Sequence, residues 1–550
     1  MRRALLRTRV KPLVAVAVGL AIAAAPWTPT GRAADRGHGA PDAKTAAGSE
    51  TSGSMERSEA PMPPAPCPLT STMRIESAVP TWEDDPVPTP RKQAWEDERG
   101  GREAARPAVR ARLKDWPTTL LVDRATLPTE ERAFLERLAR DTWVGLDAFT
   151  DRENGLPVDH VRLPDDASDA AEAEIGDYTN VTNIGLHLIA VVAASQLGLV
   201  TPTNAVAAID KMLDTLARLD TFQGFFFNYY DTTTLERSSN FISFVDSAWL
   251  TAGLIVARAA FPPLAGRTGP LIERMNYRFF YDQSLGLLSH GYFVHRRARS
   301  RYHYGVLYTE ARLGALLAIG KRDIPERTWF DMVRTYPADC LGQTQTPVGA
   351  RQKTVRGHTV WDGHYRWEGI DYVPSWGGSM FEALMPTLVL DEGRVAPRSL
   401  GANDVAHATV QRRFALETLG YPVWGLSPSS VPPGDRYHEF GVPVLGARGY
   451  GAGVVTPHAS ALALATTPAE AVANLRLLAD RYDLWGPYGL YDAVDPTSGQ
   501  VSRSYLALDQ SMILIALANH LRPHAVPDLF ATDPIVQRAV GILGDESFFD

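Results

Sequence analysis

TEERAFLERLARDTWVGLDAF, residues 129–149, is the stretch that most clearly indicates the fold. The residues of its inner face recur at spacings of three and four, which is typical of a helix with one buried side, and they are Phe134, Leu135, Leu138, Thr142, Leu146 and Phe149. Thr129 precedes them and can cap the helix, because its hydroxyl accepts a hydrogen bond from a free backbone N–H. The stretch therefore predicts an amphipathic helix packed on a core.

Helical patterns of this kind recur along the chain, about a dozen in all, with little alternating strand pattern between them. Thr182 can cap one helix, and Thr201-Pro202 begins the next with Pro at the favoured first position. The segment 467–470, Thr-Pro-Ala-Glu, has the form of a capping box. Because short and long connections alternate, we expect an all-α fold, an (α/α)6 toroid whose long loops form a cleft on one rim.

The composition is that of a globular protein. The chain has 550 residues, of which 45% are hydrophobic and 21% charged, so it can bury a large core. Its formal net charge is −8, which argues against nucleic acid as the partner, because phosphate binding needs a dense basic face.

The first residues have the pattern of an export signal. Arginines and a lysine precede the apolar run 13–25, which is too short to span a bilayer. We expect a signal peptide over 1–34, a flexible Pro-, Ala- and charge-rich tether over 35–115, and the toroid domain over 116–550. No later segment is apolar enough for a membrane span, so a secreted or cell-surface monomer is expected.

Two cysteines, Cys67 and Cys340, are too few for a disulfide scaffold. An oxidising compartment would permit one bridge between them, which would fasten the tether to the domain. Two unpaired thiols are the alternative, and the sequence leaves both open.

The segment SWGGSMFEALMP, residues 375–386, joins an aromatic, glycine-rich loop to an apolar helix through a carboxylate, Glu382. An aromatic face stacks on a sugar ring, glycine permits close approach of a ligand, and the start of a helix favours negative charge. The alternative is that Trp376 and Phe381 are core residues and Glu382 is a solvated helix start.

Nine segments of the chain, taken together, show a family pattern. They are 151–157, 182–186, 224–231, 242–247, 304–313, 376–386, 424–429, 487–492 and 508–512. In this order they resemble the glycoamylase-like family, which includes secreted bacterial endo-β-1,2-glucanases and one region of cyclic β-1,2-glucan synthases. The resemblance implies an (α/α)6 toroid that acts on a β-linked glucan without a metal. Thr309, Phe244 and an insertion at 341–365 depart from the family pattern.

Three carboxylates are the catalytic candidates. Cleavage of a glycoside needs one carboxylic acid that keeps its proton near neutral pH and a second carboxylate. Glu310 opens an apolar helix after an aromatic run, so we expect it to be the proton donor. Asp246 and Glu382 also stand at helix starts, and the base or nucleophile remains open among the residues Asp246, Glu382, Asp231, Asp371 and Asp492.

Substrate contacts are expected from the long loops. Rings that could stack on sugars are Phe226, Trp367, Tyr372, Trp376, Trp424, Trp485 and Tyr488. Arg312, Asn183 and Gln510 could hold hydroxyl groups. Each of these aromatic residues could equally belong to the core.

Histidines invite a metal interpretation, and the candidates are His290, His303, His358, His364, His438 and His458. None forms an i, i+4 pair with a helper Glu, so we expect no metal and no other cofactor. The expected function is a secreted glycoside hydrolase on β-1,2-glucan or a related polysaccharide. The alternatives are a glycan-binding envelope protein without activity and a retaining transglycosylase.

Overall fold

The computed structural model describes residues 108–117, 122, 124–164, 173–340, 342–432 and 436–549. The fold of this part is dominated by helices, and it contains no closed sheet. This confirms the expected helical character. The predicted signal peptide and most of the predicted tether lie outside the described residues.

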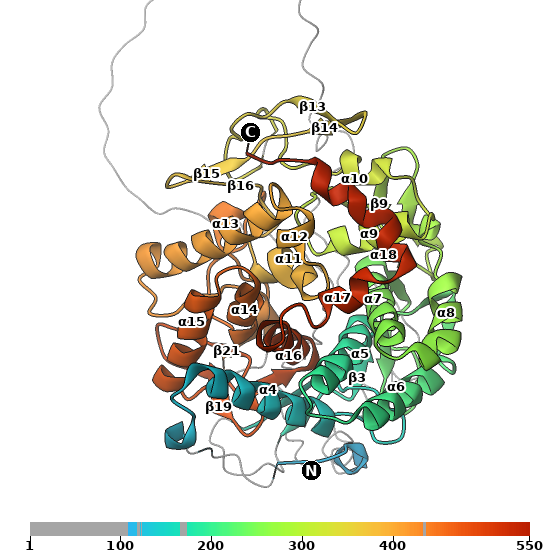
Figure 1. Ribbon diagram of the computed structural model, residues 1–550, viewed down its shortest axis with the longest axis vertical. Helices are drawn as coiled ribbons and strands as arrows, with labels where there is room; N and C mark the ends of the chain where they lie inside the picture. Colours follow the sequence, from blue (N-terminus) through green and yellow to red (C-terminus); the bar gives the residue numbers. More distant parts are fainter. Residues whose placement is uncertain are drawn as a thin grey trace, which may run out of the picture.

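Six of the helices in the described chain pack side by side in a cycle: α5 (Val181–Gln196), α7 (Phe244–Ala260), α9 (Ala311–Gly320), α11 (Met380–Leu384), α14 (Pro457–Leu462) and α16 (Ala507–Leu521). Helix α16 contacts α5, which returns the cycle to its first member. Between α9 and α11 the link is Arg312, whose guanidinium donates to the carbonyl oxygens of Glu382 and Ala383. In Figure 1 these helices surround the middle of the molecule.

Further helices cover the outside of this cycle, as Figure 1 shows. Helix α4 packs on α16, α6 on α5, α8 on α7, α10 and α18 on α9, α13 on α11, and α15 on α14. Their bounds, with those of two short connecting helices, are α4 (Glu131–Ala148), α6 (Pro202–Leu216), α8 (Ala265–Arg274), α10 (Arg327–Asp331), α12 (Glu392–Val395), α13 (Leu400–Arg413), α15 (Pro468–Arg481), α17 (Pro527–Ala531) and α18 (Pro534–Ala539).

Two glycines explain how closely α5 and α7 approach. A Cβ atom at Gly185 would lie 2.4 Å from the carbonyl oxygen of Trp249, and one at Gly253 would lie 2.3 Å from the carbonyl oxygen of Gly185. Real Cβ atoms do not come this close to a backbone oxygen, so larger residues would force the two helices apart. The contact between α5 and α7 therefore depends on glycine at both positions.

Helix starts agree with the sequence in part. Thr201 caps α6, with Pro202 at the first helical position, as predicted. Helix α4 is capped by the side chain of Glu130 rather than by Thr129, and α5 by Asn180 rather than by Thr182. The expected capping box at residues 467–470 is absent, because no side chain caps the start of α15.

Short strands occur in the connections between the helices of the described chain. They are β1 (His160–Arg162), β2 (Glu174–Ile175), β3 (Tyr178–Asn180), β4 (Thr221–Phe222), β5 (Phe225–Phe226), β6 (Tyr229–Asp231), β7 (Phe241–Ser243), β8 (Tyr281–Asp282), β9 (Leu287–Ser289), β10 (Gly291–Phe293), β11 (Ala298–Arg299), β12 (His303–Tyr304), β13 (Gln352–Val355), β14 (His358–Trp361), β15 (Tyr365–Trp367), β16 (Ile370–Tyr372), β17 (Ser429–Val431), β18 (Arg436–His438), β19 (Trp485–Gly486), β20 (Gly489–Leu490), β21 (Ala493–Val494), β22 (Val501–Ser502) and β23 (Ser504–Leu506).

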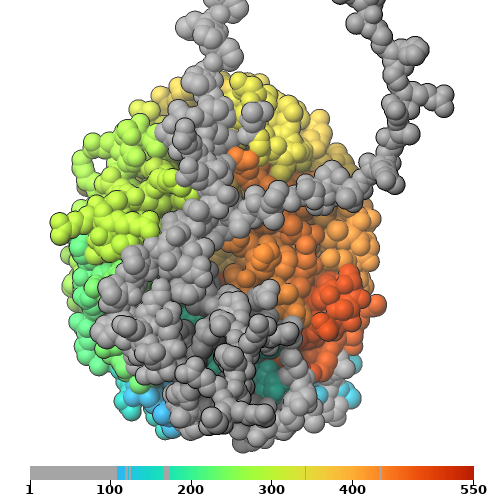
Figure 2. Space-filling view, turned by 180° about the vertical axis from the view of Figure 1, so that it is seen from behind, coloured from blue at the N-terminus to red at the C-terminus, as the bar shows by residue number. Residues whose placement is uncertain are grey.

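Hairpin β13–β14 lies within the expected insertion at 341–365. Together with β15 and β16 it extends from one end of the helical body, at the top of Figure 1. Figure 2 shows the same yellow region at the upper edge from behind. The insertion therefore adds structure at the periphery of the helices.

The described end of the predicted tether contacts the domain. Arg112 pairs with Asp151 at 2.7 Å, and Leu113 is only 1% exposed. Contacts with the domain therefore begin before residue 116, the expected boundary. Cys340 is buried and disulfide-bonded, whereas Cys67 lies outside the described residues. Across the described chain, no helix is both long enough and apolar enough to traverse a bilayer.

Candidate functional site

The starts of α7, α9 and α11 bring three carboxyl groups into one buried cluster. They belong to Asp246, Glu310 and Glu382, and each side chain is at most 2% exposed. The charges of Glu382 and Asp246 both act on Glu310, so the three groups lie within electrostatic range of one another. The structure thus gathers the three residues that the sequence singled out as catalytic candidates.

Glu310 carries the most unusual carboxyl group of the cluster. It stands directly before α9 and is 1% exposed, and neither of its oxygens has a hydrogen-bond partner. Burial, followed by the negative charge of Glu382, raises the pKa of Glu310 to about 8. The carboxyl group therefore keeps its proton at neutral pH and has that proton free to donate.

Asp246 lies in the first turn of α7 and is held on one side only. The Thr182 hydroxyl, from α5, donates to Oδ1 at 2.7 Å, whereas Oδ2 has no partner. Burial raises the pKa of Asp246 to about 6, although hydrogen bonds from Ser243 and Thr182 oppose the shift. Asp246 is thus ionised at neutral pH and keeps one oxygen available.

Glu382 is bound on both oxygens by its own loop. Its carboxylate accepts hydrogen bonds from the Ser375 hydroxyl at 2.8 Å and from the Gly377 N–H at 2.9 and 3.1 Å. With Ser379 it forms a capping box at the start of α11. Burial raises its pKa, and the hydrogen bonds from Gly377, Ser375 and Ser379 oppose this. Because these donors stabilise the ionised form, we assign the proton of the pair to Glu310.

Arg312 fastens the beginning of α9 to α11. It is fully buried, and its five N–H groups all donate: two to Glu392, and the others to the carbonyl oxygens of Thr309, Glu382 and Ala383. No donor remains for a ligand, so the expectation that Arg312 holds substrate hydroxyls is wrong. Its role is to position Glu310 and Glu382 relative to each other.

Most of the rings expected to contact substrate pack in the core. Phe226 is 1% exposed, with Arg274 over its ring, and the Tyr372 hydroxyl donates to the carbonyl oxygen of Val444. Two further rings, Trp424 and Trp485, are at most 3% exposed. The expected sugar stacking by these four side chains does not agree with their burial, because a core ring offers no free face.

Trp376 and Trp367 occupy different surroundings. The indole N–H of Trp376 is buried without a partner, in a small cluster that also contains Cys340 and Ala447. Trp367 lies in hairpin β15–β16, half-buried under the Arg413 guanidinium. Of the predicted aromatic contacts, Trp376 is the one on the loop that binds Glu382.

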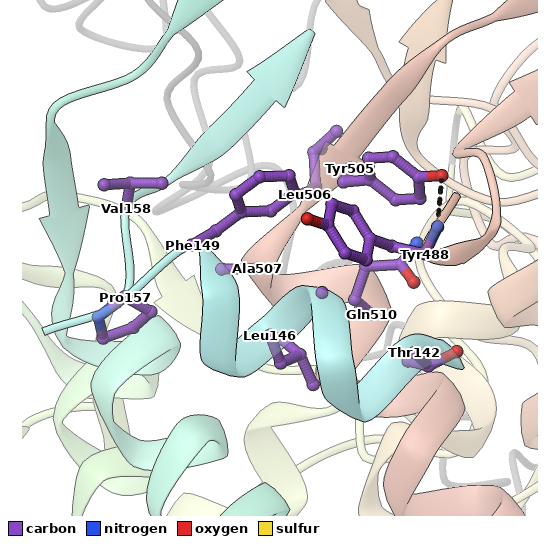
Figure 3. Close-up of a pocket in the computed structure, with 11 residues that line it drawn as sticks. Thr142, Leu146, Phe149, Pro157, Val158, Tyr488, Tyr505, Leu506, Ala507 and Gln510 are labelled. Atoms are coloured by element: carbon purple, nitrogen blue, oxygen red, sulfur yellow. Dashed lines mark hydrogen bonds between the residues drawn. The ribbon is translucent and has the colours of Figure 1, made fainter. Parts of the chain in front are cut away.

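Tyr488 and Gln510 line a pocket between α4 and α16, shown in Figure 3. Its volume is about 20 Å³, which is enough for about one water molecule. A sugar ring does not fit this space. This pocket is therefore no sugar subsite. Asn183, the third expected polar contact, donates instead to Asp159 at 3.0 Å.

The remaining candidates for the base lie elsewhere. Asp371 forms a partly exposed ion pair with Arg366, and Asp231 accepts N–H groups of its own turn at Thr233 and Thr234. Asp492 belongs to a different buried cluster with His458. The groups with the largest effect on the pKa of Glu310 are instead Glu382, Arg312 and Asp246.

Two tyrosines lie beside the carboxyl cluster: Tyr304, which belongs to the aromatic run before Glu310, and Tyr450, which was not among the predicted site residues. The Tyr304 ring lies against Phe244, and the charges of Glu310 and Asp246 add to the burial that raises its pKa. Burial, followed by the negative charge of Glu382, likewise raises the pKa of Tyr450, whose hydroxyl lies close to the Glu382 side chain. The glycines around Tyr450 were the only sequence signal for this part of the site.

Comparisons with known proteins agree with the helical architecture. The model of the Glycoamylase family matches residues 348–534, and a family of unknown function matches residues 137–247. A cyclic β-(1,2)-glucan synthase of Rhizobium meliloti is 33% identical over 299 residues, which are 52% of this chain and 9% of the synthase. An exo β-1,2-glucooligosaccharide sophorohydrolase of Parabacteroides distasonis is 23% identical over 400 residues, or 65% of this chain and 52% of that protein. The matches thus span less than two thirds of either relative.

Solved structures show the same fold. The endo-β-1,2-glucanase of Chitinophaga pinensis superposes with a TM-score of 0.60 at 18% identity, over 76% of this chain and 99% of that one. The β-1,2-glucanase of Parabacteroides distasonis gives the same TM-score and identity, over 76% of this chain and 61% of that one. The family model over residues 348–534, the relatives and the shared fold agree with the resemblance of this chain to the glycoamylase-like family.

Proposed function

We propose that this protein is a glycoside hydrolase that cleaves a β-1,2-linked glucan within the chain, with Glu310 as the proton donor. The observation that carries the proposal is the state of that carboxyl group. It is buried, accepts no hydrogen bond from another residue, and has a pKa raised to about 8 beside two other carboxyl groups. A general acid for glycoside cleavage needs this combination.

Asp246 is the second carboxylate of the proposed reaction, acting as base or nucleophile. It is ionised at neutral pH, and its Oδ2 atom is free of hydrogen bonds. The charge of Glu382 raises the pKa of Glu310, and its carboxylate binds the loop that contains Trp376. Division of roles between a protonated and an ionised carboxyl group follows from their different surroundings.

The substrate class rests on the relatives. The sophorohydrolase is named for β-1,2-glucooligosaccharides, and both glucanases that share the fold are named for β-1,2-glucan. We further propose an (α/α)6 toroid, which the closed cycle of inner helices supports. Action outside the cytoplasm is proposed on the export pattern of the first residues.

The test is incubation of purified protein with linear β-1,2-glucan and with a panel of β-1,3-, β-1,4- and β-1,6-glucans. We expect new reducing ends from β-1,2-glucan and a ladder of short oligosaccharides. No new reducing ends from any glucan would contradict the proposal. In that event, a binding assay that still detects β-1,2-glucan would favour a glycan-binding protein.

Transglycosylation is the second candidate function, because the relative with the highest identity reported above is a cyclic glucan synthase. The products of transglycosylation differ from those of hydrolysis. A transglycosylase would produce longer or cyclic oligosaccharides with little net gain of reducing ends. Mass analysis of the products at high substrate concentration separates the two reactions.

A further inference from the structure

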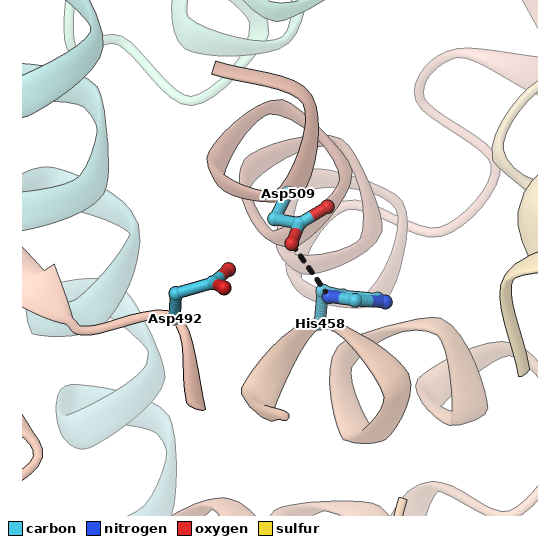
Figure 4. Close-up of side chains that lie close together, drawn as sticks. All are labelled: His458, Asp492 and Asp509. Atoms are coloured by element: carbon cyan, nitrogen blue, oxygen red, sulfur yellow. Dashed lines mark ion pairs between the residues drawn. The ribbon is translucent and has the colours of Figure 1, made fainter. Parts of the chain in front are cut away.

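A second buried cluster lies at the starts of α14 and α16, outside the set of groups assigned to glycan cleavage. It contains His458, Asp492 and Asp509, whose side chains are at most 1% exposed. One nitrogen or oxygen atom of each lies within 4.8 Å of the others. Figure 4 shows the three side chains pointing toward one another from two helices and a connecting segment.

The ion-pair contact of Asp509 is with the imidazole of His458, which belongs to the same cluster. Among the described residues, neither Asp492 nor Asp509 forms an ion pair with Lys or Arg. The nearby carboxylate of Asp159 adds to the negative field at Asp509. Burial of carboxylates without neutralisation is strongly unfavourable, so the cluster needs either protons or a cation.

The carboxylate oxygens are also left without hydrogen bonds. As ionised groups, Asp509 accepts no hydrogen bond on either oxygen and Asp492 accepts none on Oδ1, although the two carboxyl groups can share a hydrogen bond when one of them is protonated. The other oxygen of Asp492 accepts from the Ser430 N–H at 2.7 Å and from the Ser430 hydroxyl. One oxygen of Asp492 is thus held in place while the other remains available. Metal-binding carboxylates are typically oriented in this way by outer hydrogen bonds.

The spacing of the ligand atoms suits a small ion. Nδ1 of His458 lies 3.2 Å from Oδ2 of Asp509. Two ligands of a tetrahedral zinc ion with bonds of about 2.1 Å are roughly 3.4 Å apart. The Thr456 hydroxyl also lies 2.8 Å from Nδ1, and it can rotate its proton away from a coordinating nitrogen.

We propose that His458, Asp492 and Asp509 form a binding site for a divalent transition-metal ion. One imidazole nitrogen with two carboxylates is a mixed donor set, which suits Zn²⁺ or Mn²⁺ better than Mg²⁺ or Ca²⁺. The ion would neutralise the buried carboxylates and connect α14, α16 and the segment of Asp492. The site goes beyond the proposed glycan cleavage and does not depend on it.

The test begins with the full-length protein, treated with a chelator and then dialysed against Zn²⁺. Metal analysis is expected to give one zinc per chain, and the thermal midpoint is expected to rise with zinc concentration, because a ligand of the folded state stabilises it. Ca²⁺ and Mg²⁺ at the same concentration should have a smaller effect. No zinc uptake by the wild-type protein would overturn the proposal and would leave a proton shared by the two aspartates.

Two variants test whether the proposed residues bind the ion. Asp509→Asn and His458→Gln are expected to weaken zinc binding at least about tenfold, whereas His407→Gln, which removes another buried imidazole, should not. Equal zinc uptake by Asp509→Asn and the wild type would overturn the assignment. If these variants fail to fold, the visible spectrum of the cobalt-loaded wild-type protein tests whether the metal has protein ligands. Tetrahedral cobalt with nitrogen and oxygen ligands is expected, and a spectrum of hydrated cobalt would contradict the site. No glucan is present, so the result is independent of glycan cleavage.

Discussion

The starts of α9 and α11 carry two buried glutamates that differ in one respect. Glu310 has no hydrogen bond on either oxygen, whereas Glu382 is bound by Ser375, Gly377 and Ser379. Burial raises the pKa of both groups, and the charge of Glu382 adds to the shift at Glu310, whereas hydrogen bonds oppose the shift at Glu382. The comparison teaches that hydrogen bonding, more than burial, separates a reactive carboxyl group from an architectural one.

The largest effect is expected from Glu310→Gln, which tests whether Glu310 donates the proton. The substitution keeps shape and removes the transferable proton, so turnover on β-1,2-glucan is expected to fall about 10²- to 10⁴-fold. Reducing-end assays measure the loss, and binding of glucan should persist. Retained turnover in a folded variant would show that another group donates the proton.

Removal of the Arg312 guanidinium, which connects the starts of α9 and α11, should chiefly affect stability. Arg312→Met leaves Glu392 buried without a partner, and the free energy of unfolding is expected to fall by about 3–5 kcal/mol. Chemical denaturation measures the loss. The double variant Arg312→Met with Glu392→Met is the matched control and should recover much of it. An equal loss in both variants would contradict the role of the ion pair.

Glu382→Gln tests how Glu382 affects the stability of its loop and the pKa of Glu310. The loop around Trp376 loses charge-assisted hydrogen bonds, so the free energy of unfolding should fall by about 1–3 kcal/mol. The charge that raises the pKa of Glu310 is also removed. Activity requires the protonated form of Glu310, so the loss of activity on the basic side should move to lower pH. An unchanged basic limb would show that Glu382 does not tune Glu310.

The pH dependence of stability gives a smaller effect of the same origin. In the unfolded chain Glu310 loses its proton near its ordinary pKa, whereas in the folded protein it keeps the proton up to about pH 8. This group therefore stabilises the fold fully at low pH, and that contribution is lost as pH rises toward 8, by at most about 1.4 kcal/mol per pH unit. Denaturation of wild type and Glu310→Gln at several pH values measures it, and identical slopes would contradict the raised pKa.

The smallest effect is expected at an exposed carboxylate. Asp371 pairs with Arg366 at a partly exposed hairpin, so Asp371→Asn should change the free energy of unfolding by less than about 1 kcal/mol. Turnover should be unchanged. A large loss of turnover would place Asp371 in the reaction and weaken the assignment of Asp246.

The helices and the carboxyl cluster were predictable from the sequence because both depend on local pattern. Asp246, Glu310 and Glu382 each precede or begin an apolar run, and neighbouring helices in a cycle bring such starts together. Helix capping was less predictable. Thr467 stands in a capping pattern without making the bond, since the backbone before α15 adopts another conformation.

Contacts over long sequence distances could not be predicted. Arg312 stands two residues after Glu310 and looked available to a ligand, but its carboxylate partner Glu392 lies 80 residues away. Phe226 and Trp424 sit in glycine-rich, aromatic segments, and only three-dimensional packing reveals that they belong to the core. His458 shares no local motif with the two aspartates beside it.

The protonation state of Glu310 is the central claim, and infrared difference spectroscopy of wild type against Glu310→Gln tests it directly. We expect a protonated-carboxyl band at pH 7 that is absent from the variant and disappears as pH rises through about 8. A spectrum with only ionised carboxylate at pH 6 would contradict it.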